Sequence, residues 1–135
     1  MAIIETKRAA ERHLLALTPV VPTAFEGVSF TTPTGLYQRL QFIIRQPDDP
    51  VLGKGYYRER LSMQVFVCAE LNKGTAEAIA RAELIRNWFA KGTTLQEQNI
   101  RIHVLSTPQI TGTVVTQDRL VCPVLIELTA EVYTD

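Results

Sequence analysis

The chain has 135 residues, the size of one domain, and its 46% hydrophobic share supports a packed core and excludes a disordered protein. Fourteen basic and fourteen acidic side chains give a net charge of zero, which argues against strong non-specific binding to nucleic acid. A local basic patch remains open, and a neutral chain does little to prevent self-association.

The first predicted element is a helix over 3–17, because apolar residues recur at helical spacing and charged residues fill the other face. These charges, with no apolar h-region after them, argue against a signal peptide. No apolar run is long enough to span a membrane. Pro19 ends the helix, and an extended connector leads to a short strand expected over 24–30.

Two longer strands are predicted over 36–46 and 56–69, since apolar and polar residues alternate in both. Between them, 46–55 contains two prolines, two glycines and two aspartates, so a loop of about ten residues is expected. Hairpin loops usually have two to five residues. Two interpretations stay open: a flexible surface excursion, or a segment that becomes ordered when a partner docks.

A second helix is predicted over 75–91, with Thr75 as its N-cap and Gly92 as its C-terminal stop. Glu77 and Arg81 have the spacing of a favourable surface ion pair. The apolar stripe of this helix contains Ala78, Ala82, Ile85 and Phe89.

Strands are expected over 100–105, 109–116 and 119–133, and Pro123 marks an edge or a bulge because it has no amide hydrogen. The predicted fold class is α+β, a single domain (1–135) with two helices and a mainly antiparallel mixed sheet in the order α-β-β-β-α-β-β-β. The predicted core contains Leu61, Met63, Val65, Ile85, Phe89, Val124 and Ile126.

The sequence contains no recognisable catalytic, cofactor or metal motif. His13 and His103 lack metal-ligand spacing, and Gly53-Lys54-Gly55 lacks the spacing of a phosphate-binding loop. Asp48 and Asp49 are adjacent, as turn residues often are. Cys68 and Cys122 lie in apolar runs and are expected to be reduced core thiols in a cytoplasmic protein. We therefore expect no enzyme activity and no cofactor.

The strand positions that alternate with the predicted core positions form a second face of the sheet. This face mixes apolar residues with arginines, a composition favoured in protein interfaces. This face is expected to hold Tyr37, Arg39, Ile43, Arg45, Arg58, Arg60, Phe66, Val121, Leu125, Glu127 and Glu131. A solvated face with Arg–Glu pairs across strands is the alternative. The mixed face and the long loop together give a candidate assembly interface, which contains Arg39, Arg45, Asp48, Asp49, Gly53, Lys54, Gly55, Tyr56, Tyr57, Arg58 and Arg60.

The whole chain resembles the tail-terminator or tail-completion proteins of long-tailed bacteriophages. The resemblance lies in the first helix beginning Ile3-Ile4-Glu5, the long hairpin with its Gly/Pro loop, the helix ending Ile85-Arg86-Asn87-Trp88-Phe89, and the last strand. It implies a structural protein that forms a hexameric ring, caps the tail tube, ends its polymerisation and presents a surface to the head connector.

The same resemblance implies that DNA passes through the ring without specific binding and that no membrane is involved. The protein would act in the host cytoplasm during assembly and then in the virion tail. The isolated chain is expected to be a monomer at low concentration. Two other readings stay open: a small α+β ligand-binding or enzymatic domain, and another phage head–tail connector component.

Overall fold

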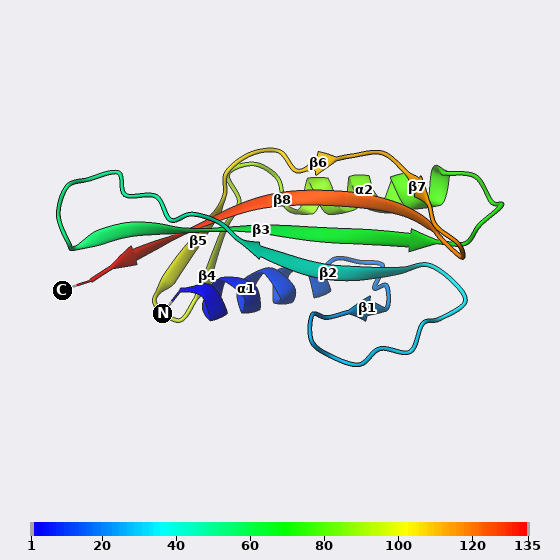
Figure 1. Cartoon of the computed structure of the whole chain (residues 1–135), viewed down its shortest axis with the longest axis horizontal. Coiled ribbons are helices and arrows are strands. Elements are labelled where there is room, and N and C mark those ends of the chain that lie inside the picture. The colour runs from blue at the N-terminus through cyan, green and yellow to red at the C-terminus, as the bar shows by residue number, and fades with distance from the viewer. Residues whose placement is uncertain (1, 135) are drawn as a thin grey trace.

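Two long antiparallel strands form the centre of the fold. In the computed structural model, which describes residues 2–134, β3 (Tyr56–Ala69) and β8 (Leu120–Tyr133) pair along their whole length, from Tyr56 opposite Tyr133 to Ala69 opposite Leu120. β2 (Tyr37–Ile44) pairs with the other edge of β3, and β1 (Thr23–Ala24) adds a short parallel pair to β2. Figure 1 shows the resulting elongated molecule, with these strands along its length.

The far side of β8 carries four shorter strands. β5 (Ile100–Val104), β6 (Gln109–Ile110) and β7 (Val114–Val115) each pair with β8, and β4 (Thr94–Glu97) pairs with β5. Within residues 2–134 the sheet therefore has eight strands, and with α1 (Ile3–Leu15) and α2 (Ala76–Trp88) the predicted α+β class and element order are confirmed.

One hydrophobic core lies between the sheet and the two helices. Inward positions alternate along β3 and β8 as the sequence predicts, because neighbouring strand residues point to opposite faces. Every predicted core residue is buried: Leu61, Met63, Val65, Ile85, Phe89, Val124 and Ile126. Cys68 and Cys122 are buried and free, and burial raises the pKa of both thiols.

Pro123 sits where the far edge of β8 loses its partner. β6 pairs with Val124 and Leu125, β7 pairs with Leu120 and Val121, and residues 111–113 between them belong to neither strand. Thr111 N still donates to Pro123 O (3.2 Å). The predicted strand over 109–116 is thus two short strands, and the break coincides with the proline that has no amide to donate.

Arg81 corrects the prediction of a surface ion pair with Glu77. Its side chain is only 3% exposed and points into the molecule, where Nε donates to Gln38 Oε1 (3.3 Å) and Nη1 donates to Pro19 O (2.7 Å). Gln38 in turn donates through Nε2 to Thr23 Oγ1 (3.0 Å). Arg81 therefore ties α2 to the connector that follows α1.

Other boundaries also differ from the sequence expectation. α1 ends at Leu15 and α2 spans Ala76–Trp88, and Thr75 stands at the N-cap of α2 without a side-chain hydrogen bond to the helix. Gly92 has a φ of +89° in the turn beyond the helix. The predicted strand over 24–30 is reduced to β1, and β4 is a strand that the sequence did not indicate.

α1 and α2 are joined by reciprocal contacts of His13 and Trp88. Trp88 Nε1 donates to His13 O (2.6 Å), His13 Nε2 lies 2.9 Å from Trp88 O, and the two rings stack at 4.8 Å. These contacts give His13 a structural role between the helices. No helix within residues 2–134 is long and apolar enough to cross a membrane.

Candidate assembly surface

The connection between β2 and β3 projects from one end of the molecule, and we call residues 45–55 the arm (Figure 1). Its first part continues the hairpin. Arg45 N donates to Arg60 O (2.8 Å), and Asp48 and Arg58 exchange backbone hydrogen bonds of 2.9 and 2.8 Å. The Asp48 carboxylate also lies 3.4 Å from the Arg58 guanidinium. The part without backbone pairing is therefore shorter than the ten-residue loop that the sequence predicts.

The returning side of the arm is fixed by the end of the chain. Thr134 N donates to Gly55 O (2.9 Å), and Thr134 Oγ1 donates to Lys54 O. Beside this contact the rings of Tyr56 and Tyr133 pack at 4.9 Å. The arm is thus held at both sides of its base, and its tip extends beyond the sheet.

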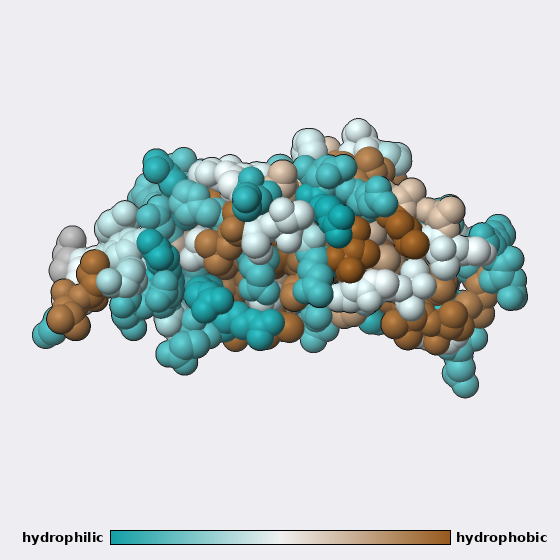
Figure 2. Space-filling model, turned by 90° about the horizontal axis from the view of Figure 1, so that it is seen from above, coloured by the Kyte–Doolittle hydropathy of each residue, from teal (hydrophilic) through white to brown (hydrophobic). Residues whose placement is uncertain are grey.

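The tip of the arm carries apolar side chains in solvent. Leu52 is fully exposed (105%) and Val51 is 53% exposed. In Figure 2 the end of the molecule that carries the arm shows hydrophobic groups. An exposed pair of this kind at the end of an anchored projection is typical of a contact site, because solvent gives it no stabilisation.

The face of the sheet away from the helices, which we call the open face, carries the mixed residues that the sequence indicated. The strand register aligns Arg39 with Phe66, Ser62 with Glu127 and Arg58 with Glu131. The Arg39 guanidinium lies over the Phe66 ring at 5.0 Å. Arginines outnumber glutamates here, so a neutral chain presents a locally basic surface.

A hydrogen-bonded network crosses the open face near the arm. Arg58 Nε donates to Tyr56 Oη (3.0 Å), and Tyr56 Oη donates to Glu131 Oε1 (3.2 Å). His103 Nε2 lies 3.1 Å from Glu131 Oε2. The hydrogen bond from His103, with a smaller one from Tyr56, lowers the pKa of Glu131. Arg58 thus reaches Glu131 through a tyrosine instead of the direct cross-strand pair considered from the sequence.

A second network lies further along the same face. Arg45 Nε donates to Ser62 Oγ (2.7 Å), and the Ser62 hydroxyl lies 2.9 Å from both carboxylate oxygens of Glu127. Arg45, Arg60 and Glu127 border a hollow of about 590 Å³ together with Leu105. Arg60 makes no ion pair with any residue of the described chain 2–134.

The candidate interface residues therefore separate into two groups, with one residue in neither. One group lies on the open face (Arg39, Tyr56, Arg58 and Arg60, with Arg45 at the start of the arm), and a second lies further along the arm (Asp48, Asp49, Gly53, Lys54 and Gly55). Tyr57 belongs to neither, because it has the inward parity of β3 and packs against the core. The structure therefore places Tyr57 apart from the other candidate interface residues.

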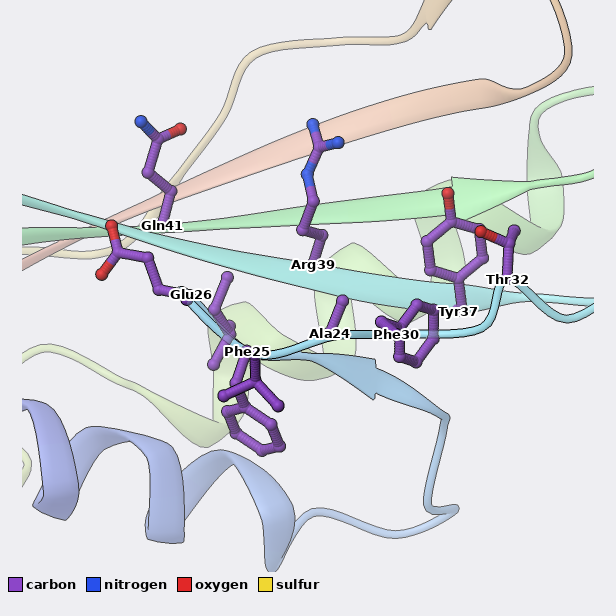
Figure 3. Close-up of a pocket in the computed structure, with 11 residues that line it drawn as sticks. Ala24, Phe25, Glu26, Phe30, Thr32, Tyr37, Arg39 and Gln41 are labelled. Atoms are coloured by element: carbon purple, nitrogen blue, oxygen red, sulfur yellow. The ribbon is translucent and has the colours of Figure 1, made fainter.

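The segment after β1 forms a groove beside β2 (Figure 3). Arg119 donates to the carbonyls of Pro33, Thr34 and Gly35, which fixes the end of this segment. Glu26 Oε2 accepts a hydrogen bond from Phe42 N (3.3 Å) at its start. The groove has a volume of about 410 Å³, with Phe30 beside Tyr37 and with Arg39 and Gln41 on one side, whereas Phe25 points toward α1.

The described residues 2–134 contain no group of three or more His, Cys, Asp or Glu side chains that could hold a metal ion. The two histidines have different structural roles, since His13 joins the helices and His103 belongs to the open-face network. What the surface offers is an anchored apolar tip, a basic face and shallow grooves. Such features suit contacts with other macromolecules.

Comparison with known proteins decides the family. Residues 5–127 match the family described as Phage tail terminator protein. The chain belongs to this family. No curated protein matches it. A solved structure superposes with a TM-score of 0.77 at 20% identity, covering 100% of this chain and 99% of the other, and at this identity the likeness shows the fold alone.

The family gives this chain a structural role in the phage tail, and its candidate functional surfaces are contact surfaces. Sequence reasoning about this tail terminator missed two of them. The exposed apolar tip had a signal, because Val51-Leu52 interrupts a polar loop. The grooves beside residues 25–28 had none, because they arise when segments distant in sequence come together.

Proposed function

We propose that this tail terminator assembles as a ring, expected to be a hexamer, on the end of the tail tube. The ring stops the addition of further tube subunits and presents its other side to the head connector. DNA passes through its centre without specific binding, and assembly takes place in the host cytoplasm before the protein becomes part of the virion tail. The whole chain, 1–135, acts as one tail-terminator-like domain.

The observation that carries this proposal is the anchored arm with its exposed apolar tip in a member of the tail terminator family. A ring requires each subunit to offer two different surfaces that meet around a closed rotation. The arm lies at one end of the molecule, and other candidate surfaces lie along its length, so one copy has both kinds of surface (Figure 1). Ending a polymer needs no chemistry, only a subunit that binds the tube and offers no site for the next tube subunit.

The test is tail-tube polymerisation in the presence of increasing amounts of the protein. We expect electron microscopy to show shorter tubes with a ring at one end, and native mass measurement to give a closed oligomer on tube ends. Leu52→Asp should remove the effect, and Val115→Asp should not, because Val115 is also an exposed apolar residue (68%) but lies in β7, away from the arm. Tubes of unchanged length with the protein bound only at the head end would instead indicate a head–tail connector.

A further inference from the structure

We propose that the tip of the arm of one copy inserts into the groove between α1 and residues 25–28 of the next copy. This inference rests on the proposed ring and names the contact that closes it. The partner is a second copy of this chain, and the contact joins Leu52 to an apolar groove and Asp49 to Arg8.

The groove offers the apolar surroundings that Leu52 at the tip lacks in its own subunit. It has a volume of about 520 Å³ and is lined by Leu15 of α1 and by Phe25 and Val28 of the facing segment. Leu15 is 43% exposed and Val28 is 63% exposed in the isolated chain. Burying Leu52 here would remove apolar surface from water on both partners, which favours association.

Charges at the groove and at the tip are complementary. Glu26 is bound by Lys7 (3.0 Å), and Arg12 is bound by Glu97. The remaining carboxylate, Glu11, is partly desolvated, which raises its pKa. Arg8 has no carboxylate partner within residues 2–134, and at the tip Asp49 has none either, whereas Asp48 is held by Arg58. Asp49 and Arg8 are therefore both available to pair with each other.

The spacing of the two contacts also agrees. Arg8 and Leu15 are seven residues apart on α1, a rise of about 10 Å at 1.5 Å per residue, and they lie on the same face of the helix. Asp49 and Leu52 are three residues apart, and the chain spans at most about 10 Å over that distance. Residues 51–55 of the tip are bends, which breaks the strict alternation of side chains in an extended strand, so Asp49 and Leu52 can face the same groove within this distance.

Two other hollows fit the tip less well. The hollow beside Arg45 and Arg60 has a single aliphatic residue, Leu105, and the hollow beside Asn99 and Arg101 has none. The arm of the same copy cannot fill the α1 groove, because it extends away from α1 at the end of the sheet (Figure 1). Tip and groove are different surfaces, so the contact is head-to-tail and repeats from copy to copy until a ring closes.

Charge reversal tests the polar half of the contact. Arg8→Asp and Asp49→Arg should each weaken ring formation about tenfold, because like charges then face each other, and the double variant should restore it. Leu52→Ala should weaken it about ten- to a hundredfold through lost apolar burial. Lys91→Asp is the control for a change of charge elsewhere, and should leave ring formation unchanged. The measurement is oligomer mass by sedimentation in the presence of tail-tube ends.

Disulfide cross-linking tests the apolar half. Leu52→Cys combined with Val28→Cys should give a ladder of covalent oligomers on oxidation, whereas a mixture of the two single variants should stop at dimers. The native thiols do not interfere, because Cys68 and Cys122 are buried. Leu52→Cys combined with Leu84→Cys on α2 is the matched control and should give no ladder.

The results separate this inference from the proposed function. If wild-type protein forms rings and shortens tubes, but the double charge variant is not restored and the ladder does not form, this contact is wrong and the ring stands. Cross-linking of Leu52→Cys to tube protein would likewise overturn it, because the tip would then bind the tube. If the wild type forms no ring at all, the proposed function fails and this contact fails with it.

Discussion

Arg81 shows how one residue can stand on the buried side of a helix and remain charged. In α2 the buried positions are Ala78, Arg81, Ala82 and Ile85, which is the spacing of a single helix face. The small alanines leave space for the long side chain to lie along the helix and reach Pro19. Burial lowers the pKa of Arg81, yet its guanidinium remains a donor to two oxygen atoms, those of Gln38 and Pro19.

Replacing this side chain should be costly. Arg81→Met keeps the length of the side chain but leaves the Pro19 carbonyl and the Gln38 side chain without their donor. Hydrogen bonds to charged groups contribute about 1.5–3 kcal/mol, so we expect the free energy of unfolding to fall by about 2–3 kcal/mol. Urea denaturation measures this loss. Lys91→Met, at an exposed position, should change it by less than about 0.5 kcal/mol.

The central strands give a second prediction at the same scale. Leu61 and Ile126 are fully buried on the adjacent strands β3 and β8 and belong to the same core. Leu61→Ala should lower the free energy of unfolding by about 2–5 kcal/mol, because it removes buried methyl groups and leaves a cavity. Thermal and urea unfolding should agree on the loss. A cost below 1 kcal/mol would contradict the inward direction of Leu61.

At the level of elements, a side-chain hydrogen bond on the open face links Glu131 of β8 to Tyr56 of β3. Because hydrogen bonds lower its pKa in the folded protein, Glu131 contributes stability at pH values above its unfolded pKa, near 4.5. That contribution is lost as the pH falls through the lowered folded value. We therefore expect wild-type stability to decline on acidification below about pH 4.5, and Glu131→Gln to show a shallower decline.

Glu131 is accessible to solvent, so the effect should be small, and the comparison of slopes decides more than the absolute stability. His103→Gln is the matched variant, because it removes the main partner of Glu131 and should also flatten the acid limb. Identical acid limbs for all three proteins would show that this network does not couple protonation to folding.

The arm is the element whose state should depend on assembly. In the free chain the amides of Asp48 and Arg58 are paired, whereas Asp49 to Lys54 are exposed, so hydrogen exchange should be slow at the base and fast at the tip. On binding to tail-tube ends, the tip amides should become protected. Slow exchange at the tip in the free chain, or fast exchange in the assembled state, would contradict a role of the arm in assembly.

For the whole molecule, alternation in sequence was enough to place the long strands, because β3 and β8 each bury mainly one face. Ile44 shares the inward parity of Leu40 and Phe42 but is 59% exposed. It lies at the end of β2 beside the arm, outside the core cluster that the helices cover. The repeating pattern predicts which way each side chain points, but it does not predict how far the helices cover the sheet.

Features that depend on distant contacts were less accessible to sequence reasoning. β4 has only four residues, Thr94 to Glu97, and pairs with β5, so its sequence has too few alternations to be recognised. The inward turn of Arg81 depends on the connector at Pro19. For the candidate assembly surface, composition indicated the arm and the open face, but only the structure brings α1 and residues 25–28 together into a groove.

The position of β8 in the chain has a consequence for how the protein is made. β8 pairs with β3, β5, β6 and β7, and all of these precede it in the sequence. During synthesis the sheet therefore lacks its central strand until residues 120–133 have left the ribosome, and such long-range pairing makes folding slow. Since Thr134 also fixes the base of the arm, a chain cut short during translation would lack both the core and the anchored arm. We expect such fragments to be degraded before they could compete for a place on the tail.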